Sequence, residues 1–165
     1  IYKLYPDKRA IYLAALQRYM EDGNSRTAKR NAEMSPEAAL REMLEFVAQL
    51  SSAPLGEKGC FTIAAASELL PGDEEVKSKV SSKFNNIINE LEWILVRGQQ
   101  EGIFRQDEHA RVMAQSIFMM LEGMRIYGKL QPEIKELQST NDFIVRTILA
   151  ENYNKAGQLS VKASA

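Results

Sequence analysis

The chain has 165 residues and carries 21 Lys and Arg against 22 Asp and Glu, which gives a net charge of −1. This length suits one domain, and a composition of 45% hydrophobic and 26% charged residues is typical of globular rather than disordered chains. A chain this neutral lacks the positive field that holds nucleic acid, so DNA binding would require a small local surface or further residues.

The compartment is indicated by cysteine usage and by the absence of long apolar runs. A single cysteine, Cys60, excludes an internal disulfide and suits a cytoplasmic protein. No apolar run reaches the roughly 18 residues of a membrane span, and no signal peptide is visible. We therefore expect a cytoplasmic protein with no membrane partner.

The chain opens on a short apolar and aromatic stretch, residues 1–5 (IYKLY), which looks like the end of an element that begins upstream. Pro6, Asp7 and Lys8 then predict a helix start, with Pro in the first turn and Asp near the N-terminus. This helix should run to Asp22, because a glycine follows. Residues 24–34 are polar and basic. Three cationic residues of this stretch, Arg26, Lys29 and Arg30, either form a phosphate-binding patch or belong to a solvated loop.

Two further helices are predicted before the longest one. Residues 35–50 begin with Ser35 as N-cap and Pro36 in the first turn, and their apolar residues recur at helical spacing. Residues 59–71 (GCFTIAAASELLP) predict a short Ala-rich helix whose small side chains allow close approach to a neighbour. Cys60 at its start is either a low-pKa nucleophile or redox sensor, or a small packed residue.

The longest helix is predicted from Asp73 to Glu101, with apolar residues at spacings of three and four. Asp73 is a good N-cap, and Gly102 follows the end. A helix of this length spans roughly 40 Å at about 1.5 Å per residue, so shorter helices must pack along it. Trp93 lies toward the polar side, where it either packs under a neighbouring helix or faces a cavity.

Residues 107–128 predict a helix that is apolar on two sides, so both sides should be covered. One side can pack on the long helix, and its methionines suit either an irregular core or an adaptable pocket wall. The other side carries the small residues Ser116 and Gly123, and we interpret it as a subunit contact. Two last helices are expected, one from Pro132 and one from Asn141 or Asp142 to near Lys155.

Apart from Cys60, the sequence offers no basis for catalysis or for a bound cofactor. No Gly-rich phosphate loop follows a strand, and the lone His109 assembles no Ser/His/Asp set. One histidine with scattered carboxylates does not make a zinc site. We therefore expect no catalytic residues, no metal and no cofactor.

Three stretches resemble TetR/AcrR-type bacterial regulators. Residues 1–20 (IYKLYPDKRAIYLAALQRYM) match the junction between the DNA-recognition helix and the next helix, except for Ile1, Tyr5 and Arg9, where the family favours Leu, Phe and an acidic residue. Residues 59–73, with a Gly-Cys pair, an Ala run and a Pro-Gly-Asp turn, are similar to the effector domain of one branch. Residues 97–107 (RGQQEGIFRQD) continue the likeness, which covers most of the chain.

The resemblance implies an all-α fold, a TetR-like C-terminal helical bundle around one long central helix that dimerises through its last two helices. Residues 1–8 would end a helix-turn-helix that lies mostly upstream, residues 9–156 would form the effector-binding and dimerisation domain, and residues 157–165 would be a loose tail. Tyr2 and Lys8, with Lys3 between them, would contact DNA phosphates. The alternative is that Tyr2 packs on the next helix and Lys8 is merely solvated.

The function that the resemblance implies is that of a ligand-responsive regulator, a repressor, in which a small and mostly apolar effector releases a homodimer from operator DNA. The effector would act by population shift, moving the helix of residues 6–22. Helical faces give these pocket candidates, with Asn89 as the polar anchor: Phe46, Phe61, Phe84, Ile88, Asn89, Trp93, Met113, Ile117 and Met120. The dimer candidates are Ser116, Met119, Gly123, Phe143, Thr147 and Ala150.

Two other functions remain open at this point. One is a helical protein–protein association module that binds neither ligand nor DNA. The other is an all-α enzyme that uses Cys60 as its nucleophile. The first would need no cavity, and the second would need an exposed and reactive thiol.

Overall fold

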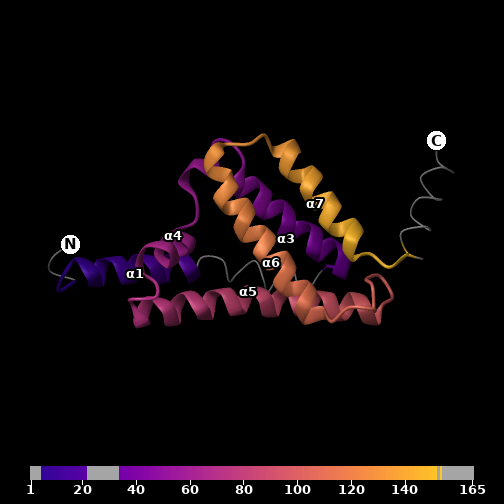
Figure 1. Cartoon of the computed structure of the whole chain (residues 1–165), viewed down its shortest axis with the longest axis horizontal. Helices are drawn as coiled ribbons and strands as arrows, with labels where there is room; N and C mark the ends of the chain where they lie inside the picture. Colours follow the sequence, from indigo (N-terminus) through magenta and orange to yellow (C-terminus); the bar gives the residue numbers. More distant parts are fainter. Residues whose placement is uncertain (1–4, 22–33, 152, 154–165) are drawn as a thin grey trace.

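Helix α5 (Glu74–Gln100) is the longest element; four other α-helices pack against it, and the last one packs against two of those instead (Figure 1). The computed structural model describes residues 5–21, 34–151 and 153. In that part the fold is all-α, as predicted, and strand-like pairing is limited to one isolated bridge between Phe104 and Leu149. No helix there is both long and apolar enough to cross a membrane. The remaining elements are α1 (Lys8–Glu21), α3 (Pro36–Ser51), η1 (Leu55–Lys58), α4 (Phe61–Leu69), α6 (Ala110–Tyr127), η2 (Gly128–Leu130) and α7 (Ile134–Ile148).

The ends of α5 follow from local chemistry. The Asp73 carboxylate accepts a hydrogen bond of 3.0 Å from the Val76 backbone N–H, and two glutamates follow in the first turn, where the helix dipole favours negative charge. Near the other end, Gly98 lets the ring of Phe104 pack directly on the helix backbone. A Cβ at Gly98 would lie 1.9 Å from that ring, so only glycine fits there.

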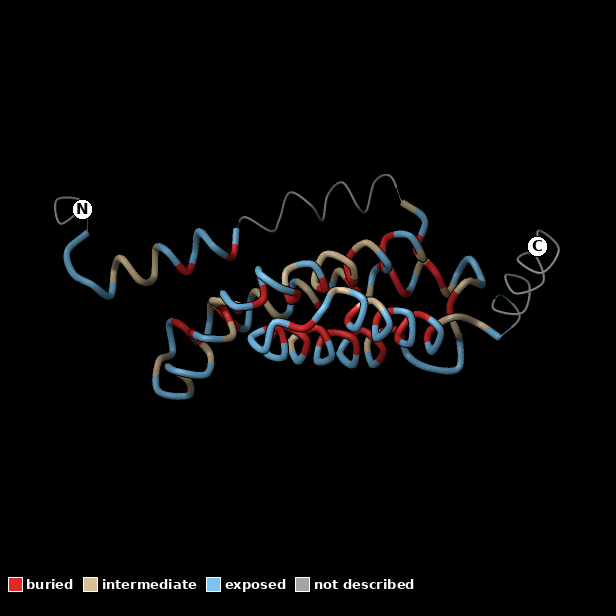
Figure 2. The backbone as a smooth tube through the Cα atoms, turned by 90° about the horizontal axis from the view of Figure 1, so that it is seen from above, coloured by how far each residue is buried: buried red, intermediate tan, exposed pale blue. Residues whose placement is uncertain are grey.

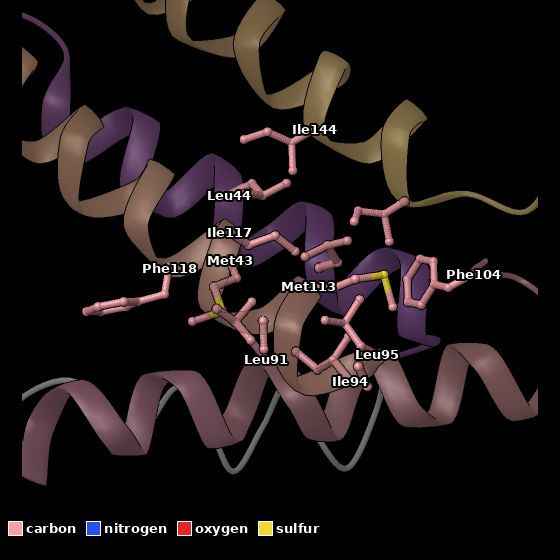
Figure 3. Close-up of a cluster of buried hydrophobic side chains, with 14 of the residues drawn as sticks. Met43, Leu44, Leu91, Ile94, Leu95, Phe104, Met113, Ile117, Phe118 and Ile144 are labelled. Carbon is pink, nitrogen blue, oxygen red and sulfur yellow. The ribbon is translucent and has the colours of Figure 1, made fainter. Parts of the chain in front are cut away.

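The main hydrophobic core lies between α3, α5, α6 and α7 (Figure 3). Figure 3 shows side chains from these helices converging above α5, among them Leu44, Leu91, Ile117 and Ile144. All four are at most 2% exposed, so this cluster accounts for much of the apolar burial that stabilises the fold.

A second, smaller core joins α1 and α4 to the N-terminal half of α5. It contains Leu16, Met20, Ala65, Val76 and Val80. Figure 2 shows α1 as a separate arm beside the main bundle, with buried positions confined to one side. The position of α1 therefore depends on a cluster distinct from the main core.

Most helix boundaries agree with the sequence prediction, but α6 and α7 differ. Helix α6 begins at Ala110 rather than at Asp107, because Asp107 instead accepts a 2.6 Å hydrogen bond from Arg105 in the preceding turn. The prediction of two last helices was wrong, since α7 is one continuous helix. Asn141 lies inside it as a buried residue rather than a cap, and the helix ends at Ile148 because Leu149 turns to pair with Phe104.

Candidate functional site

A cavity of about 570 Å³ lies where α3, α5 and α6 meet the start of α4 and the C-terminal end of α1. This volume is within the usual range of small-molecule sites in proteins, roughly 300–1,000 Å³. Leu55 and Tyr19 at its margin are 44% and 41% exposed, so the cavity is open to solvent on that side. Its lining comprises Tyr19, Met43, Phe46, Val47, Leu50, Leu55, Lys58, Gly59, Cys60, Thr62, Lys83, Phe84, Ile87, Glu90, Leu121, Glu122 and Arg125.

The apolar wall comes mainly from one face of α3. Its side chains recur every three or four residues as Met43, Phe46, Val47 and Leu50, so they all face the same way. Opposite them, the Phe84 ring of α5 lies 5.0 Å from the Phe118 ring, centroid to centroid, which fixes its orientation. The result is a largely hydrophobic surface with aromatic rings on two sides.

Arg125 is buried and belongs to the cavity lining, and its guanidinium donates to the backbone carbonyls of Leu50 and Gly59. The Leu50 carbonyl belongs to the last turn of α3, whose carbonyls have no partner within their own helix. Arg125 therefore ties α6 to the end of α3 and to the segment before α4. Its charge is engaged by protein dipoles.

Glu122 lies one turn before Arg125 on α6 and also lines the cavity. Its Oε2 atom is buried and has no hydrogen-bond partner. Burial raises the pKa of Glu122 to about 7, although the nearby Arg125 acts to lower it. The cavity thus contains a carboxyl group that is only partly ionised at neutral pH.

Helix α1 forms part of the cavity wall through Tyr19. The Tyr19 ring meets Phe61 of α4 edge-on with centroids 5.9 Å apart, and burial raises the pKa of its hydroxyl, with Cys60 also contributing. Next to it, the Lys83 ammonium of α5 donates a 2.8 Å hydrogen bond to the Met20 carbonyl at the end of α1. A molecule in the cavity would therefore touch α1 and its attachment to α5.

The described residues offer little for metal chemistry. Within them, no group of three or more His, Cys, Asp or Glu side chains is placed to hold a metal ion. His109 is the N-cap residue of α6 and makes no side-chain cap bond. Cys60 precedes α4, is half-buried and lines the cavity.

Residues 36–143 match the sequence profile of a family described as tetracyclin repressor-like, C-terminal domain. The match covers more than half of the chain. The chain belongs to this family. Its members are the C-terminal domains of TetR-type transcription factors, which are not enzymes, so the enzymatic alternative based on Cys60 is set aside.

Solved structures of TetR-family regulators have the same fold. A regulator from Agrobacterium tumefaciens superimposes with a TM-score of 0.79 at 18% identity, over 90% of this chain and 78% of that one. A regulator from Chloroflexus aurantiacus gives 0.76 at 18% identity, over 91% and 79%. A cysteine-substituted form of the regulator CifR in complex with 26-bp operator DNA gives 0.73 at 18% identity, over 89% and 77%. No curated protein matches the sequence significantly.

The lining of the cavity includes only Phe46 and Phe84 of the nine pocket candidates. Phe61 is not part of the lining and packs against Tyr12, with ring centroids 5.2 Å apart. The main core holds Ile88, Met113 and Ile117. Asn89 accepts a hydrogen bond from Arg111 at the surface, and Trp93 and Met120 are 42% and 40% exposed, with Arg97 stacked over the Trp93 ring.

Helical faces separate buried from exposed positions but do not separate core-filling from cavity-lining side chains. For that reason the sequence missed most of α3 and the polar groups of the cavity. One signal was available for α6. Glu122 lies four residues after Phe118, and Arg125 lies three residues after Glu122, so two charged residues fall on an apolar helix face.

The dimer candidates lie on the outward faces of α6 and α7. Phe143 and Met119 are 58% and 68% exposed, and Ser116, Gly123 and Thr147 are also exposed. Ser116 and Thr147 donate their hydroxyls to carbonyls of their own helices, so neither needs a polar partner outside. Ala150 is half-buried just after α7.

The DNA-contact candidates are placed only in part. Lys8 is the first residue of α1 and is exposed. Tyr2 and Lys3 lie outside the described residues, as do the basic residues of the next segment, Arg26, Lys29 and Arg30.

Proposed function

We propose that this chain is the effector-binding and dimerisation part of a ligand-responsive repressor. Residues 9–156 form that domain, residues 1–8 end a DNA-reading helix-turn-helix, and residues 157–165 are a tail. A homodimer holds operator DNA until a small, mostly apolar molecule enters the cavity. The observation that carries the proposal is that α1, the helix next to the DNA-reading segment, supplies part of the cavity wall.

The signal passes through contacts at the cavity. Phe84 lines it and packs against both the main core and the smaller core that holds α1. A ligand that displaces Phe84 or Tyr19 changes how α1 rests on α5, and with it the separation of the two reading heads in the dimer. The ligand acts as an inducer only if it binds the released arrangement more tightly than the DNA-bound one.

The homodimer uses the exposed apolar faces of α6 and α7, which pair with their copies as a four-helix bundle. A two-fold contact of this kind buries the same patch on both subunits. The TetR-family relative CifR in complex with operator DNA supports the DNA-bound state of the cycle. The alternative function, association without ligand or DNA, requires no cavity, so the open cavity favours the regulator.

The test begins with the complete gene product and DNA from around its own gene. Gel shift should detect a specific complex, and compounds that raise the melting temperature of the protein should dissociate it. The cavity-filling variant Leu50→Trp should lose the melting shift while it still binds DNA, because the indole occupies the ligand volume. The matched control Val96→Trp places the same ring on the outer surface of α5, where it should change neither property.

Two results would contradict the proposal. If stabilising compounds act equally on the Leu50→Trp variant, the cavity is not the effector site. If the complete gene product retains no DNA of any sequence, the repressor role fails and the association module takes its place.

A further inference from the structure

The cavity contains one feature that a purely apolar ligand would leave unused. Among the described residues, several buried side-chain oxygen and nitrogen atoms lack a partner, and only Glu122 Oε2 belongs to a residue of the cavity lining. A buried polar atom without a partner costs free energy, so it marks a place where a ligand group gains by binding.

We propose that the effector is an apolar organic amine whose protonated nitrogen pairs with the Glu122 carboxylate. This inference rests on the proposed effector-binding function and specifies the chemistry of that ligand. The nitrogen would lie against α6, and the apolar body would lie between Phe84 of α5 and the α3 wall that includes Phe46.

Two of the three cationic side chains of the cavity lining are already engaged. Arg125 donates to two backbone carbonyls, and Lys83 donates to the carbonyl of Met20. Lys58 is exposed at the margin. Inside the cavity, the anionic group of an acidic effector would therefore meet two cations that already have partners and a carboxylate that repels it, which leaves only Lys58 at the solvent-exposed margin to attract it.

The other titratable groups of the lining do not replace Glu122 in this role. Glu90 on α5 has an interaction of its own, burial raises the pKa of the Tyr19 hydroxyl of α1, Cys60 before α4 offers only a thiol, and α3 contributes apolar side chains alone. The phenylalanine rings on two sides of the cavity, Phe46 of α3 and Phe84 of α5, add surface that favours a cation over a neutral group.

Amine binding should depend on pH because the amine pairs with the ionised carboxylate. With the pKa of Glu122 at about 7, the ionised fraction rises about tenfold between pH 6 and pH 8. The affinity for an amine that stays protonated over this range should rise by about the same factor. A neutral analogue should show no such rise.

The experiment uses calorimetric titration of the complete gene product with three matched probes: 2-(1-naphthyl)ethylamine, 2-(1-naphthyl)ethanol and 1-naphthylacetate. They share one apolar body and differ in the terminal group. The amine should bind at least about tenfold more tightly than the alcohol at pH 8, and the carboxylate should bind most weakly.

The variant Glu122→Gln keeps the shape of the side chain and removes its charge. It should lose the preference for the amine and the pH dependence, while its affinity for the alcohol stays within about twofold. The control Glu57→Gln removes an equal charge from an exposed residue of η1 outside the cavity lining, and it should behave as the native protein does.

Each outcome bears on a different claim. Equal binding of all three probes, abolished by Leu50→Trp and unaffected by Glu122→Gln, overturns the amine proposal and leaves the effector cavity intact. Tighter binding of the carboxylate probe overturns it in favour of an acidic effector. If no probe binds the native protein at millimolar concentration, the effector cavity and the amine proposal fall together.

Discussion

At the scale of single residues, Glu122 links the cavity between α3, α5 and α6 to the stability of the fold. Its pKa in the folded chain is raised to about 7 by burial, above the ordinary value of 4.5. Between these values the folded state binds more protons than the unfolded state, so the free energy of unfolding decreases as pH rises. Above pH 7 Glu122 is ionised in both the folded and the unfolded state, so the free-energy cost of burying the ionised carboxylate is at its maximum and no longer changes with pH.

We therefore predict that Glu122→Gln stabilises the ligand-free protein at pH 8. The substitution replaces a buried carboxylate that is ionised at pH 8 with a neutral amide. The free energy of unfolding should therefore increase by on the order of 2 kcal/mol at pH 8, and this increase should vanish near pH 4.5. Urea unfolding followed by circular dichroism at several pH values measures it. A gain that is the same at pH 4.5 and pH 8 would mean that packing, not charge, is responsible.

At the scale of elements, the N-terminus of α5 also determines where α1 lies. The Asp73 carboxylate caps α5 and at the same time accepts a 2.5 Å hydrogen bond from the Arg9 guanidinium of α1. The hydrogen bond from Arg9 lowers the pKa of Asp73 to about 2, so the carboxylate remains charged over the whole physiological range. This stabilisation is present above the ordinary carboxyl pKa and is lost as pH falls toward 2.

The two roles of Asp73 can be separated by two substitutions. Asp73→Asn keeps a capping oxygen but loses the charge, so only amide exchange in α1 should accelerate. Asp73→Ala removes both, so exchange should also accelerate in the first turn of α5. Hydrogen exchange followed by mass spectrometry distinguishes these patterns. Faster exchange in α1 with Ala but not with Asn would assign the coupling to the cap alone.

The elements were predictable from the sequence where a periodic apolar face and a capping residue coincide. Helix α5 has both, and its predicted N-cap at Asp73 is the one observed. Helix α7 was divided wrongly because Asn141, a residue type that favours caps, lies in the middle of the helix between Leu137 and Ile144. The apolar spacing across it outweighs the local preference of one residue.

The cavity was less predictable, because it exists only where tertiary packing is incomplete. Phe84 and Ile88 lie one turn apart on the same helix, yet Phe84 lines the cavity and Ile88 is buried in the core. Their sequence environments do not separate them. What separates them is the path of α3 and α6 above α5, which no local pattern specifies.

At the scale of the whole molecule, the outward faces of α6 and α7 carry more apolar surface than an isolated chain needs. Val112, Met119, Ile126 and Phe143 are each at least 47% exposed. Scattered exposed apolar residues are ordinary, but several on two adjacent helices mark a contact surface. Most of this patch is on α6, the helix that also supplies Glu122 and Arg125 to the cavity, so the proposed dimer surface and the cavity share an element.

The proposed dimer is tested by placing a charge in this patch. Phe143→Arg should weaken dimerisation by about a hundredfold or more, because a two-fold interface contains the residue twice and each copy loses a buried aromatic contact. The monomer should remain folded, since Phe143 is 58% exposed and lies outside the core. Sedimentation velocity across micromolar concentrations measures the change, and Val96→Arg on α5 is the matched control at an exposed position away from α6 and α7. A Phe143→Arg protein that remains dimeric at low micromolar concentration would place the interface elsewhere. The four-helix arrangement and its coupling to the cavity would then have to be abandoned.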